Sequence, residues 1–312
     1  MKTNMLYGQD ILSVDQFSEK SLQLIFSTAD KMRILVAEKG GDESLKRKIM
    51  TALFYEPSSR TFGSFITAMQ RLGGGCIPLQ GVTYSSVAKG ETLADTVRTF
   101  ASYSDVVVIR HPEIGSAKIA AEFSEKPVIN AGDGTGEHPT QALLDLYTIT
   151  RHFPTLKKIT VTMVGDMLNG RTVHSLAKLL SIFKGVTLQF VAPPILRFPE
   201  ELQKKFTDRG VTVRTFETLD TALPVTDVLY VTRVQKERFT DLDSYEKLKH
   251  CYIITPKTLE HMKKNAIVMH PLPRVGEIAM DVDLDSRAVY IREEMGNGMY
   301  VRMALLKLIL LP

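Results

Sequence analysis

Residues 48 to 72 read KIMTALFYEPSSRTFGSFITAMQRL, and this stretch joins a strand pattern to a helix pattern. The first eight residues are mostly apolar, which suits a strand covered on both faces. Apolar residues then recur at Phe62, Phe65, Ile66, Met69 and Leu72, as they do along one face of a helix. A buried strand that leads directly into an amphipathic helix indicates an α/β fold.

The same alternation continues along the chain. Strand candidates are residues 48 to 55, 105 to 110, 127 to 130, 159 to 165, 186 to 192, 227 to 232 and 266 to 270, with helix-like segments between most of them. This order predicts parallel sheets of the doubly wound kind. The length of 312 residues suggests two domains, and a break falls at residues 151 to 158. We therefore expect two doubly wound α/β domains, each with a mainly parallel sheet flanked by helices.

The composition argues against several classes of protein. A net charge of +4 without a basic face or tail does not suggest a nucleic-acid partner. The two cysteines, Cys76 and Cys251, have no partner spacing, so neither a zinc site nor a disulfide framework is expected. The N-terminus lacks a signal-peptide core, and the apolar C-terminal run is shorter than the roughly 18 residues that suggest a membrane span. We expect a cytoplasmic protein without a metal, a cofactor or a membrane partner.

Ser58, Ser59, Arg60 and Thr61 lie where the first predicted strand gives way to its helix. Serines at this position often do no more than cap a helix. Capping does not explain Arg60, because a cation in the first helical turn opposes the helix dipole. Backbone N–H groups, hydroxyls and a guanidinium together form a cradle for an anion. The stretch therefore predicts a phosphate site.

Other polar side chains lie at the end of further predicted strands or just after them. They are Arg110 in IRHP, His138 and Gln141 in GDGTGEHPTQ, Arg233 and Gln235 in TRVQKER, and the proline-rich MHPLPR at 269 to 274. A histidine before a proline is often only a structural cap. In open α/β sheets, however, ligands bind outside the carboxyl ends of the strands, where these residues are expected.

One segment offers a competing interpretation. GDMLNGRT, at 165 to 172, has the glycine spacing of a nucleotide-binding P-loop, but Arg171 replaces the lysine that contacts the terminal phosphates. Asp166 would add a negative charge beside those phosphates. The alternative is a tight strand–helix turn that uses Gly165 and Gly170.

Seven segments together resemble the aspartate transcarbamoylase family. In chain order they are SSRT at 58 to 61, SxxxKGETLADT at 85 to 96, RHP at 110 to 112, GDGTGEHPTQ, GDMLNGRTVHSL, TRVQKERF and HPLPR. Ornithine transcarbamoylases typically carry His-Cys-Leu-Pro where this chain has HPLP, and they lack the RVQKER segment. One departure is Phe62, where family members often carry serine.

The resemblance implies transfer of a carbamoyl group from carbamoyl phosphate to the amine of L-aspartate, in pyrimidine synthesis. It implies catalytic roles for Arg60, Thr61, Lys89, Arg110 and His138. It implies that carbamoyl phosphate is bound by Ser58, Ser59, Arg60, Thr61, Ser85, Lys89, Arg110, His138, Gln141, Leu272 and Pro273. Aspartate would be bound by Lys89, Arg171, Arg233 and Gln235.

The resemblance also implies an organisation for the chain. Residues 1–150 would form a carbamoyl phosphate-binding domain, 151–290 an aspartate-binding domain, and the helix at 291–312 would return to the first domain. The catalytic unit would be a homotrimer, with Ser85 and Lys89 entering the site of a neighbouring subunit. Regulatory chains or fusion partners stay open. An inactive paralogue is the second hypothesis for the function, although intact SSRT, Lys89, His138 and Arg233 argue against it.

Overall fold

The computed structural model describes residues 4–81, 86–234, 245, 246, 248, 249 and 251–312. The chain forms two compact units. Unit 1 comprises Met1–Leu144 together with Gly296–Pro312, and unit 2 comprises Asp145–Met295. The division therefore falls inside helix α5 (Pro139–His152) and at the first residues of helix α10 (Met295–Leu310).

Unit 1 is built on a four-stranded parallel sheet with the order β2-β1-β3-β4. The strands are β1 (Ile49–Phe54), β2 (Gly75–Gln80), β3 (Val106–His111) and β4 (Val128–Asp133). Val107 and Ile109 pack in one hydrophobic cluster, and Val106 and Val108, which alternate with them, are equally buried. Both faces of β3 are therefore covered, which explains its continuous apolar sequence.

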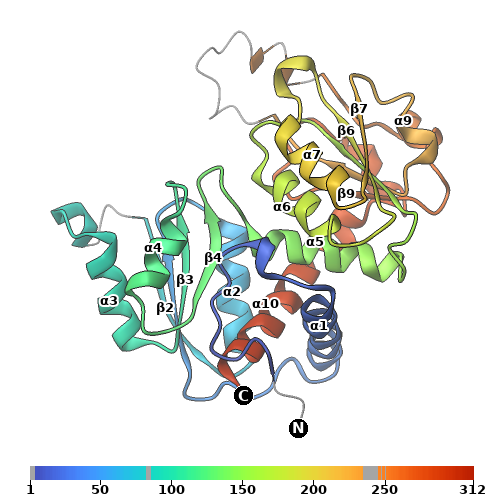
Figure 1. The fold of residues 1–312 in the computed structure, drawn as a ribbon. Helices are drawn as coiled ribbons and strands as arrows, with labels where there is room; N and C mark the ends of the chain where they lie inside the picture. The colour runs from blue at the N-terminus through green and yellow to red at the C-terminus, as the bar shows by residue number, and fades with distance from the viewer. Residues whose placement is uncertain (1–3, 82–85, 235–244, 247, 250) are drawn as a thin grey trace. The chain divides into compact units, whose positions relative to one another are not determined.

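Helices cover both faces of this sheet. Unit 1 contains α1 (Glu19–Lys39), α2 (Ser59–Arg71), α3 (Leu93–Tyr103) and α4 (Ser116–Phe123), as well as α10 and the first part of α5. Helix α2 links β1 to β2, whereas α3 and α4 link strands that progress in the opposite direction across the sheet. Right-handed crossovers then place α3 and α4 on one face and α2 on the other, as Figure 1 shows.

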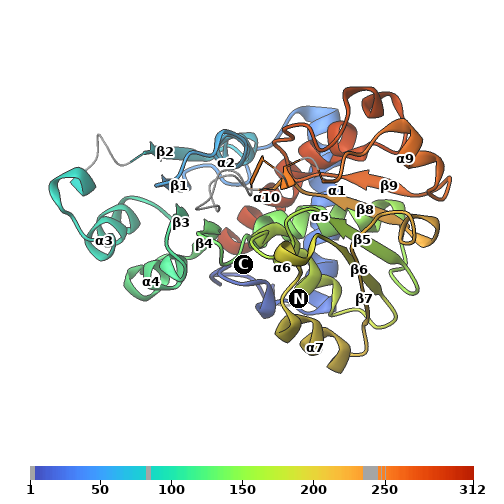
Figure 2. The ribbon, with the colours of Figure 1, turned by 90° about the horizontal axis from the view of Figure 1, so that it is seen from above.

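Unit 2 contains a five-stranded parallel sheet with the order β7-β6-β5-β8-β9, seen nearly in sequence in Figure 2. Its strands are β5 (Thr160–Val164), β6 (Thr187–Val191), β7 (Thr212–Phe216), β8 (Val228–Val231) and β9 (Ile267–Met269). Helices α6 (Arg171–Leu180) and α7 (Glu200–Asp208) lie on one face of this sheet and α9 (Pro256–Glu260) on the other. The predicted fold class, two parallel sheets that are each flanked by helices, is confirmed.

Short turns complete the described part of the chain. Single 3₁₀ turns lie at Val14–Gln16, Ser86–Lys89, Pro194–Leu196, Leu223–Val225 and Met280–Leu284, and a π-helical turn at Tyr290–Glu294 runs into α10. Among the described residues, no helix has both the length and the apolar character needed to cross a membrane.

The strand order fixes where each unit can bind a ligand. In unit 1 the chain proceeds from β1 to one side and later returns to the other side with β3. In unit 2 the same reversal occurs between β5 and β8. The loops at the carboxyl ends of two such strands diverge to opposite faces and leave a crevice between them. A ligand site is therefore expected at the carboxyl ends of β1 and β3 in unit 1, and of β5 and β8 in unit 2.

Candidate active site

The SSRT segment lies at the carboxyl end of β1 and opens helix α2. Ser58 is the N-cap residue, but its side chain makes no capping hydrogen bond, while its carbonyl accepts the Phe62 N–H at 3.0 Å. Ser59 and Arg60 are exposed in the first turn, and Thr61 is buried. The cap is thus formed by the backbone, so helix capping does not account for the Ser58 hydroxyl. The arrangement retains the features expected of an anion cradle.

Arg110 lies beside this segment because β1 and β3 are paired. It is the register partner of Phe54, and its carbonyl accepts the Tyr55 N–H at 2.8 Å. Its side chain is 14% exposed and forms an ion pair with Glu56 at 3.3 Å. A second guanidinium contact reaches the Ala131 carbonyl at 3.4 Å. The structure therefore brings Arg110 and the SSRT segment to the switch point of unit 1, and it adds Glu56, which the sequence did not single out.

His138 and Gln141 lie at the start of α5, after β4. His138 is 4% exposed, and its carbonyl accepts the N–H groups of Gln141 and Ala142 at 3.0 and 3.1 Å. As a structural cap, then, His138 acts through its backbone. Its buried imidazole and the half-buried Gln141 are held at the same edge of the sheet, because the ends of β3 and β4 pair through His111 and Asp133.

Asp133 orders the loop that carries His138. One of its carboxylate oxygens accepts the Glu137 N–H at 2.7 Å, and the other accepts the Gly115 N–H at 2.9 Å. A β-carbon on Gly134 would come within 2.5 Å of the Pro112 carbonyl oxygen, and the φ of Gly134 is +52°. Glycine is needed at this position, so the GDGTGEHP sequence is explained by the path of the loop.

In unit 2, Arg171 begins α6 directly after the loop that follows β5. Asp166 is fully buried in this loop and accepts the backbone N–H of Asn169 at 2.9 Å. A P-loop directs its backbone N–H groups at phosphate oxygens. Here the backbone N–H of Asn169 already donates to the Asp166 carboxylate. The loop is therefore the tight strand–helix turn of the second interpretation, and Gly170 is required because a β-carbon would come within 2.5 Å of the Asp166 carbonyl oxygen.

Arg233 is adjacent to this loop. A β-carbon on Gly165 would lie 2.2 Å from the Thr232 carbonyl oxygen, so the backbones after β5 and β8 are in close contact. The Thr232 N–H also donates to the Val164 carbonyl at 2.9 Å. Arg171 and Arg233, both partly buried, thus follow the two strands at the switch point of unit 2.

Leu272 and Pro273 follow β9, the strand next to β8. Leu272 has a φ of +50°, and the bond between Leu272 and Pro273 is cis. A leucine rarely adopts this left-handed backbone conformation, and such residues concentrate at functional sites. Of the remaining predicted residues, Lys89 is exposed at the end of the Ser86–Lys89 turn, whereas Ser85 and Gln235 lie outside the described residues.

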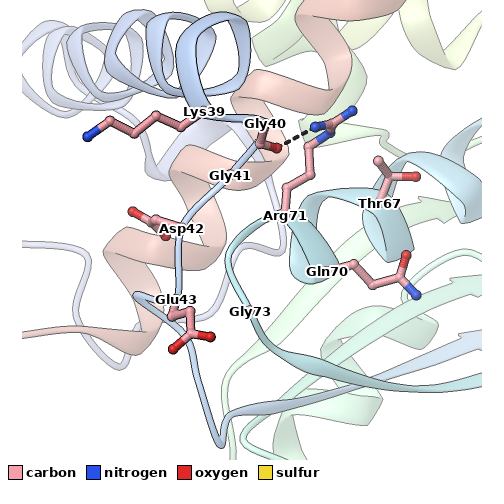
Figure 3. A pocket seen from close by; sticks show the side chains of 9 residues that line it. All are labelled: Lys39, Gly40, Gly41, Asp42, Glu43, Thr67, Gln70, Arg71 and Gly73. Carbon is pink, nitrogen blue, oxygen red and sulfur yellow. Dashed lines mark hydrogen bonds between the residues drawn. The ribbon is translucent and has the colours of Figure 1, made fainter.

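A separate cavity of about 610 Å³ opens on unit 1. Figure 3 shows it between the end of α1, the loop after it and the end of α2, with the Arg71 guanidinium donating a hydrogen bond to the Gly40 carbonyl. Arg71 is the last residue of α2 and Arg60 lies near its start, so a helical rise of 1.5 Å per residue separates them by roughly 16 Å. The cavity therefore does not coincide with the strand-end cluster.

The described residues contain no group of three or more His, Cys, Asp or Glu side chains that could hold a metal ion. What they offer instead is hydroxyls and guanidinium groups at strand ends. These groups suit the binding of anions and the stabilisation of developing negative charge.

Two family descriptions match the chain over nearly its whole length. Residues 9–151 match the carbamoyl-P binding domain of aspartate/ornithine carbamoyltransferase, and residues 157–309 match the Asp/Orn binding domain. The chain belongs to the aspartate/ornithine carbamoyltransferase family. The resemblance found from the sequence motifs is therefore confirmed.

Relatives within the carbamoyltransferase family include both separate subunits and parts of larger proteins. The chain is 47% identical over 303 residues to the aspartate carbamoyltransferase catalytic subunit of Thermococcus gammatolerans, covering 97% of this chain and 98% of that protein. It is 51% identical over 306 residues to the multifunctional protein pyr1-3 of Dictyostelium discoideum, covering 98% of this chain. The chain spans only 14% of the length of pyr1-3.

Solved structures in the carbamoyltransferase family share this fold. Aspartate transcarbamoylase from Trypanosoma cruzi in complex with carbamoyl phosphate matches with a TM-score of 0.92 and 43% identity, over 98% of this chain and 97% of that chain. The same enzyme in complex with carbamoyl phosphate and aspartate matches with a TM-score of 0.92 and 42% identity, over 98% of each chain.

Proposed function

We propose that this chain is an aspartate carbamoyltransferase that transfers the carbamoyl group of carbamoyl phosphate to the amine of L-aspartate. The products are N-carbamoyl-L-aspartate and phosphate, and the reaction serves pyrimidine synthesis. One observation carries the proposal: hydroxyl and guanidinium side chains suited to phosphate lie at the strand ends of the switch point in unit 1, and arginines suited to carboxylates lie at those in unit 2. The catalytic subunit from Thermococcus gammatolerans, matched over 98% of its length, supports the assignment.

The chemistry needs no nucleophile from the protein. The aspartate amine attacks the carbamoyl carbon, the bond from that carbon to the phosphate oxygen breaks, and the amine loses a proton. In this proposal Ser58, Ser59, Arg60 and Thr61 hold the phosphate group while it leaves as an anion. Preformed donors of this kind stabilise charge that grows in the transition state without needing to reorganise.

Further residues act on the carbamoyl group. Arg110 is proposed to contact both the phosphate and the carbonyl oxygen, where His138 and Thr61 also donate. Gln141 helps to hold the carbamoyl end. The Glu56 carboxylate keeps the Arg110 guanidinium at the end of β3 through their ion pair, which supports this role for Arg110.

In unit 2, Arg171, Arg233 and Gln235 are proposed to bind the two carboxylates of aspartate, together with Lys89. Guanidinium groups suit this task because their planar forks can pair with carboxylates in a bidentate manner. The Leu272 carbonyl and Pro273 are proposed to line the carbamoyl nitrogen and the amine.

We further propose a cytoplasmic homotrimer in which Ser85 and Lys89 complete the site of a neighbouring subunit. The exposed position of Lys89 on unit 1 is compatible with such a role. The 14% coverage of the multifunctional pyr1-3 protein also makes fusion to other enzymes a possible context for a chain of this type.

The decisive experiment measures phosphate release and carbamoyl aspartate formation from carbamoyl phosphate plus L-aspartate. Carbamoyl phosphate alone gives the background of spontaneous hydrolysis. We expect stoichiometric formation of both products above that background. Binding of carbamoyl phosphate without turnover would instead identify an inactive paralogue, and the absence of both binding and turnover would refute the proposal.

A further inference from the structure

The turn after β9 contains an unusual concentration of proline. Residues 271 to 273 read Pro-Leu-Pro, and proline carries no backbone N–H. The Leu272 N–H is therefore the only backbone donor in these three residues. Leu272 also has a left-handed backbone, with a φ of +50°. Whatever accepts the Leu272 N–H has a large influence on how this turn is held.

That acceptor is the imidazole of His270. Its Nδ1 atom accepts the Leu272 N–H at 2.7 Å, and the side chain is 1% exposed. A backbone N–H can only donate, so Nδ1 carries no proton and the proton of the neutral ring lies on Nε2. The Nε2–H then donates to a Glu277 carboxylate oxygen at 2.6 Å.

Glu277 links this contact to the other end of the turn. Its second carboxylate oxygen accepts the Val275 N–H at 2.8 Å, and its own carbonyl accepts the Ile254 N–H at 2.9 Å. Burial tends to raise the pKa of Glu277, but the hydrogen bonds from His270 and from the Val275 backbone hold this pKa below its usual value. The carboxylate is thus ionised at neutral pH and can accept hydrogen bonds from both ends of the turn.

We infer that His270 and Glu277 are positioning residues that fix the direction of the Leu272 carbonyl, and so determine how the carbamoyl amino group is recognised. This inference rests on the proposed function, in which that carbonyl accepts a hydrogen bond from the carbamoyl nitrogen. The pair does not touch the substrate. It holds the backbone N–H of Leu272, and thereby fixes this left-handed residue, whose carbonyl contacts the substrate.

Two substitutions at His270 separate its two contacts. In His270→Asn the amide oxygen lies near the former Nδ1 position and can still accept the Leu272 N–H. In His270→Gln the amide nitrogen lies near the former Nε2 position and can still donate to Glu277, but the acceptor for Leu272 is lost. Thr162→Val is a matched control, because the Thr162 hydroxyl is also fully buried in unit 2 and bonds to Gln189 at 2.8 Å.

The readout compares two inhibitors of carbamoyl transfer. Phosphonoacetamide carries a carboxamide NH₂ as well as a phosphonate, whereas inorganic phosphate has no NH₂. We expect His270→Gln to raise the inhibition constant of phosphonoacetamide by about tenfold, the value of one well-placed hydrogen bond. The KM for carbamoyl phosphate should rise by a similar factor. Phosphate inhibition should stay within about twofold for the same variant, since no contact to phosphate is removed.

His270→Asn should bind phosphonoacetamide within about threefold of the wild type, because it retains the Leu272 contact. Thr162→Val should lower the unfolding temperature without changing the ratio of the two inhibition constants. The inference would be overturned if His270→Gln and His270→Asn lost equal affinity for phosphonoacetamide. It would also be overturned if phosphonoacetamide and phosphate lost affinity in parallel, and either result would leave a purely structural role.

Glu277→Gln provides a second test if His270→Gln does not fold. Glutamine has an NH₂ group at one of the two positions where the carboxylate now accepts from His270 and Val275. When this NH₂ faces Nε2, the imidazole accepts there and carries its proton on Nδ1, so the Leu272 N–H loses its acceptor and the same selective loss of phosphonoacetamide binding is expected. An unchanged ratio of the inhibition constants would overturn the inference. Failure of the proposed function is distinguishable, because the wild-type protein itself would then not form carbamoyl aspartate.

Discussion

The hydroxyl of Tyr230 donates a 2.8 Å hydrogen bond to the carboxylate of Asp145, and both side chains are completely buried in unit 2. Burial, and then the charge of Asp145, raise the pKa of Tyr230 well above its ordinary value. A second buried carboxyl, Glu294, accepts the backbone N–H of His270 at 3.0 Å. Burial and the nearby Asp145 charge raise the pKa of Glu294 as well. Unit 2 therefore keeps a carboxyl group that resists ionisation in its interior.

Glu294→Gln should stabilise the protein at alkaline pH relative to the wild type. Because the folded pKa of Glu294 is raised, its favourable contribution is complete below the unfolded value of 4.5 and is lost as the pH rises toward the folded pKa. Glutamine keeps an acceptor for the His270 N–H but does not titrate. We expect the gain in unfolding temperature to be larger at about pH 8 than at about pH 5, by about 2 °C or more.

The control for this prediction is Glu293→Gln. Glu293 is adjacent in sequence but 34% exposed, and it pairs with Arg151 at 3.6 Å. Its substitution should give no gain at alkaline pH, since a partly exposed carboxylate pays little for its charge. An identical stability change for Glu294→Gln at both pH values would show that this carboxyl is ionised in the folded protein.

Arg60→Ala should lower kcat by roughly a hundredfold or more, because it removes a charge-assisted contact to the departing phosphate. The fold should survive, since Arg60 is exposed at the start of α2. Steady-state kinetics and a thermal melt measure the two effects. Arg98→Ala should leave kcat unchanged, because Arg98 lies on the exposed side of α3, where it pairs with Asp95 and lies over the Phe123 ring. Near-normal turnover in Arg60→Ala would contradict the anion-site assignment.

Most of the fold follows from hydrophobic patterning, and the two strands that were not predicted show why patterning has a limit. β2 and β7 are both edge strands, and their residues are largely exposed or half-buried. An edge strand has only one neighbour, so its sequence need not be apolar. β2 even contains Pro78, which an edge position tolerates because one row of its N–H groups has no partner strand.

The candidate site divides in the same way. Residues at the end of an apolar strand or just after it, such as Arg110 and Arg233, were predictable because the carboxyl end of a parallel strand is where ligands bind. Glu56, His270 and Glu277 were not, since their roles depend on partners brought close by tertiary structure. The ion pair of Glu56 with Arg110 arises only because β1 and β3 are neighbours in the sheet.

The arginines of unit 2 predict a strict choice of acceptor. Asparagine has the shape of aspartate but lacks one charge, so its use would leave a guanidinium without its partner. We expect kcat/KM for asparagine to fall on the order of a hundredfold or more, and ornithine to give no measurable product. Competition assays with each amine at fixed carbamoyl phosphate measure this. Comparable kcat/KM values for aspartate and ornithine would place the chain with the ornithine branch of the family.

Mixing two inactive variants tests the shared site. Arg60→Ala and Lys89→Ala homotrimers should each have three defective sites, if Lys89 serves the neighbouring subunit. A mixed closed ring of three has one junction where an intact Arg60 meets an intact Lys89, so random equal mixing should restore about a quarter of all sites. The variants are dissociated, mixed and reassociated, and the active sites are then titrated.

Mass measurement provides the control for this experiment, because it counts mixed trimers directly. Confirmed mixed trimers without recovered activity would mean that Lys89 acts within its own subunit or has no role. Recovery well above one site per trimer would mean that the assembly is not a closed ring of three.

Helix α10 comes last in the sequence but forms part of the core of unit 1, where Val301, Met303 and Leu305 are fully buried. Asn4, near the other end of the chain, donates to the Leu308 and Leu311 carbonyls at 2.6 and 2.9 Å. A ribosome making this chain therefore releases every residue of unit 2 before it releases the last helix of unit 1. The usual order of co-translational folding is reversed: the unit that is begun first is completed last, and its apolar surface must wait for its final helix.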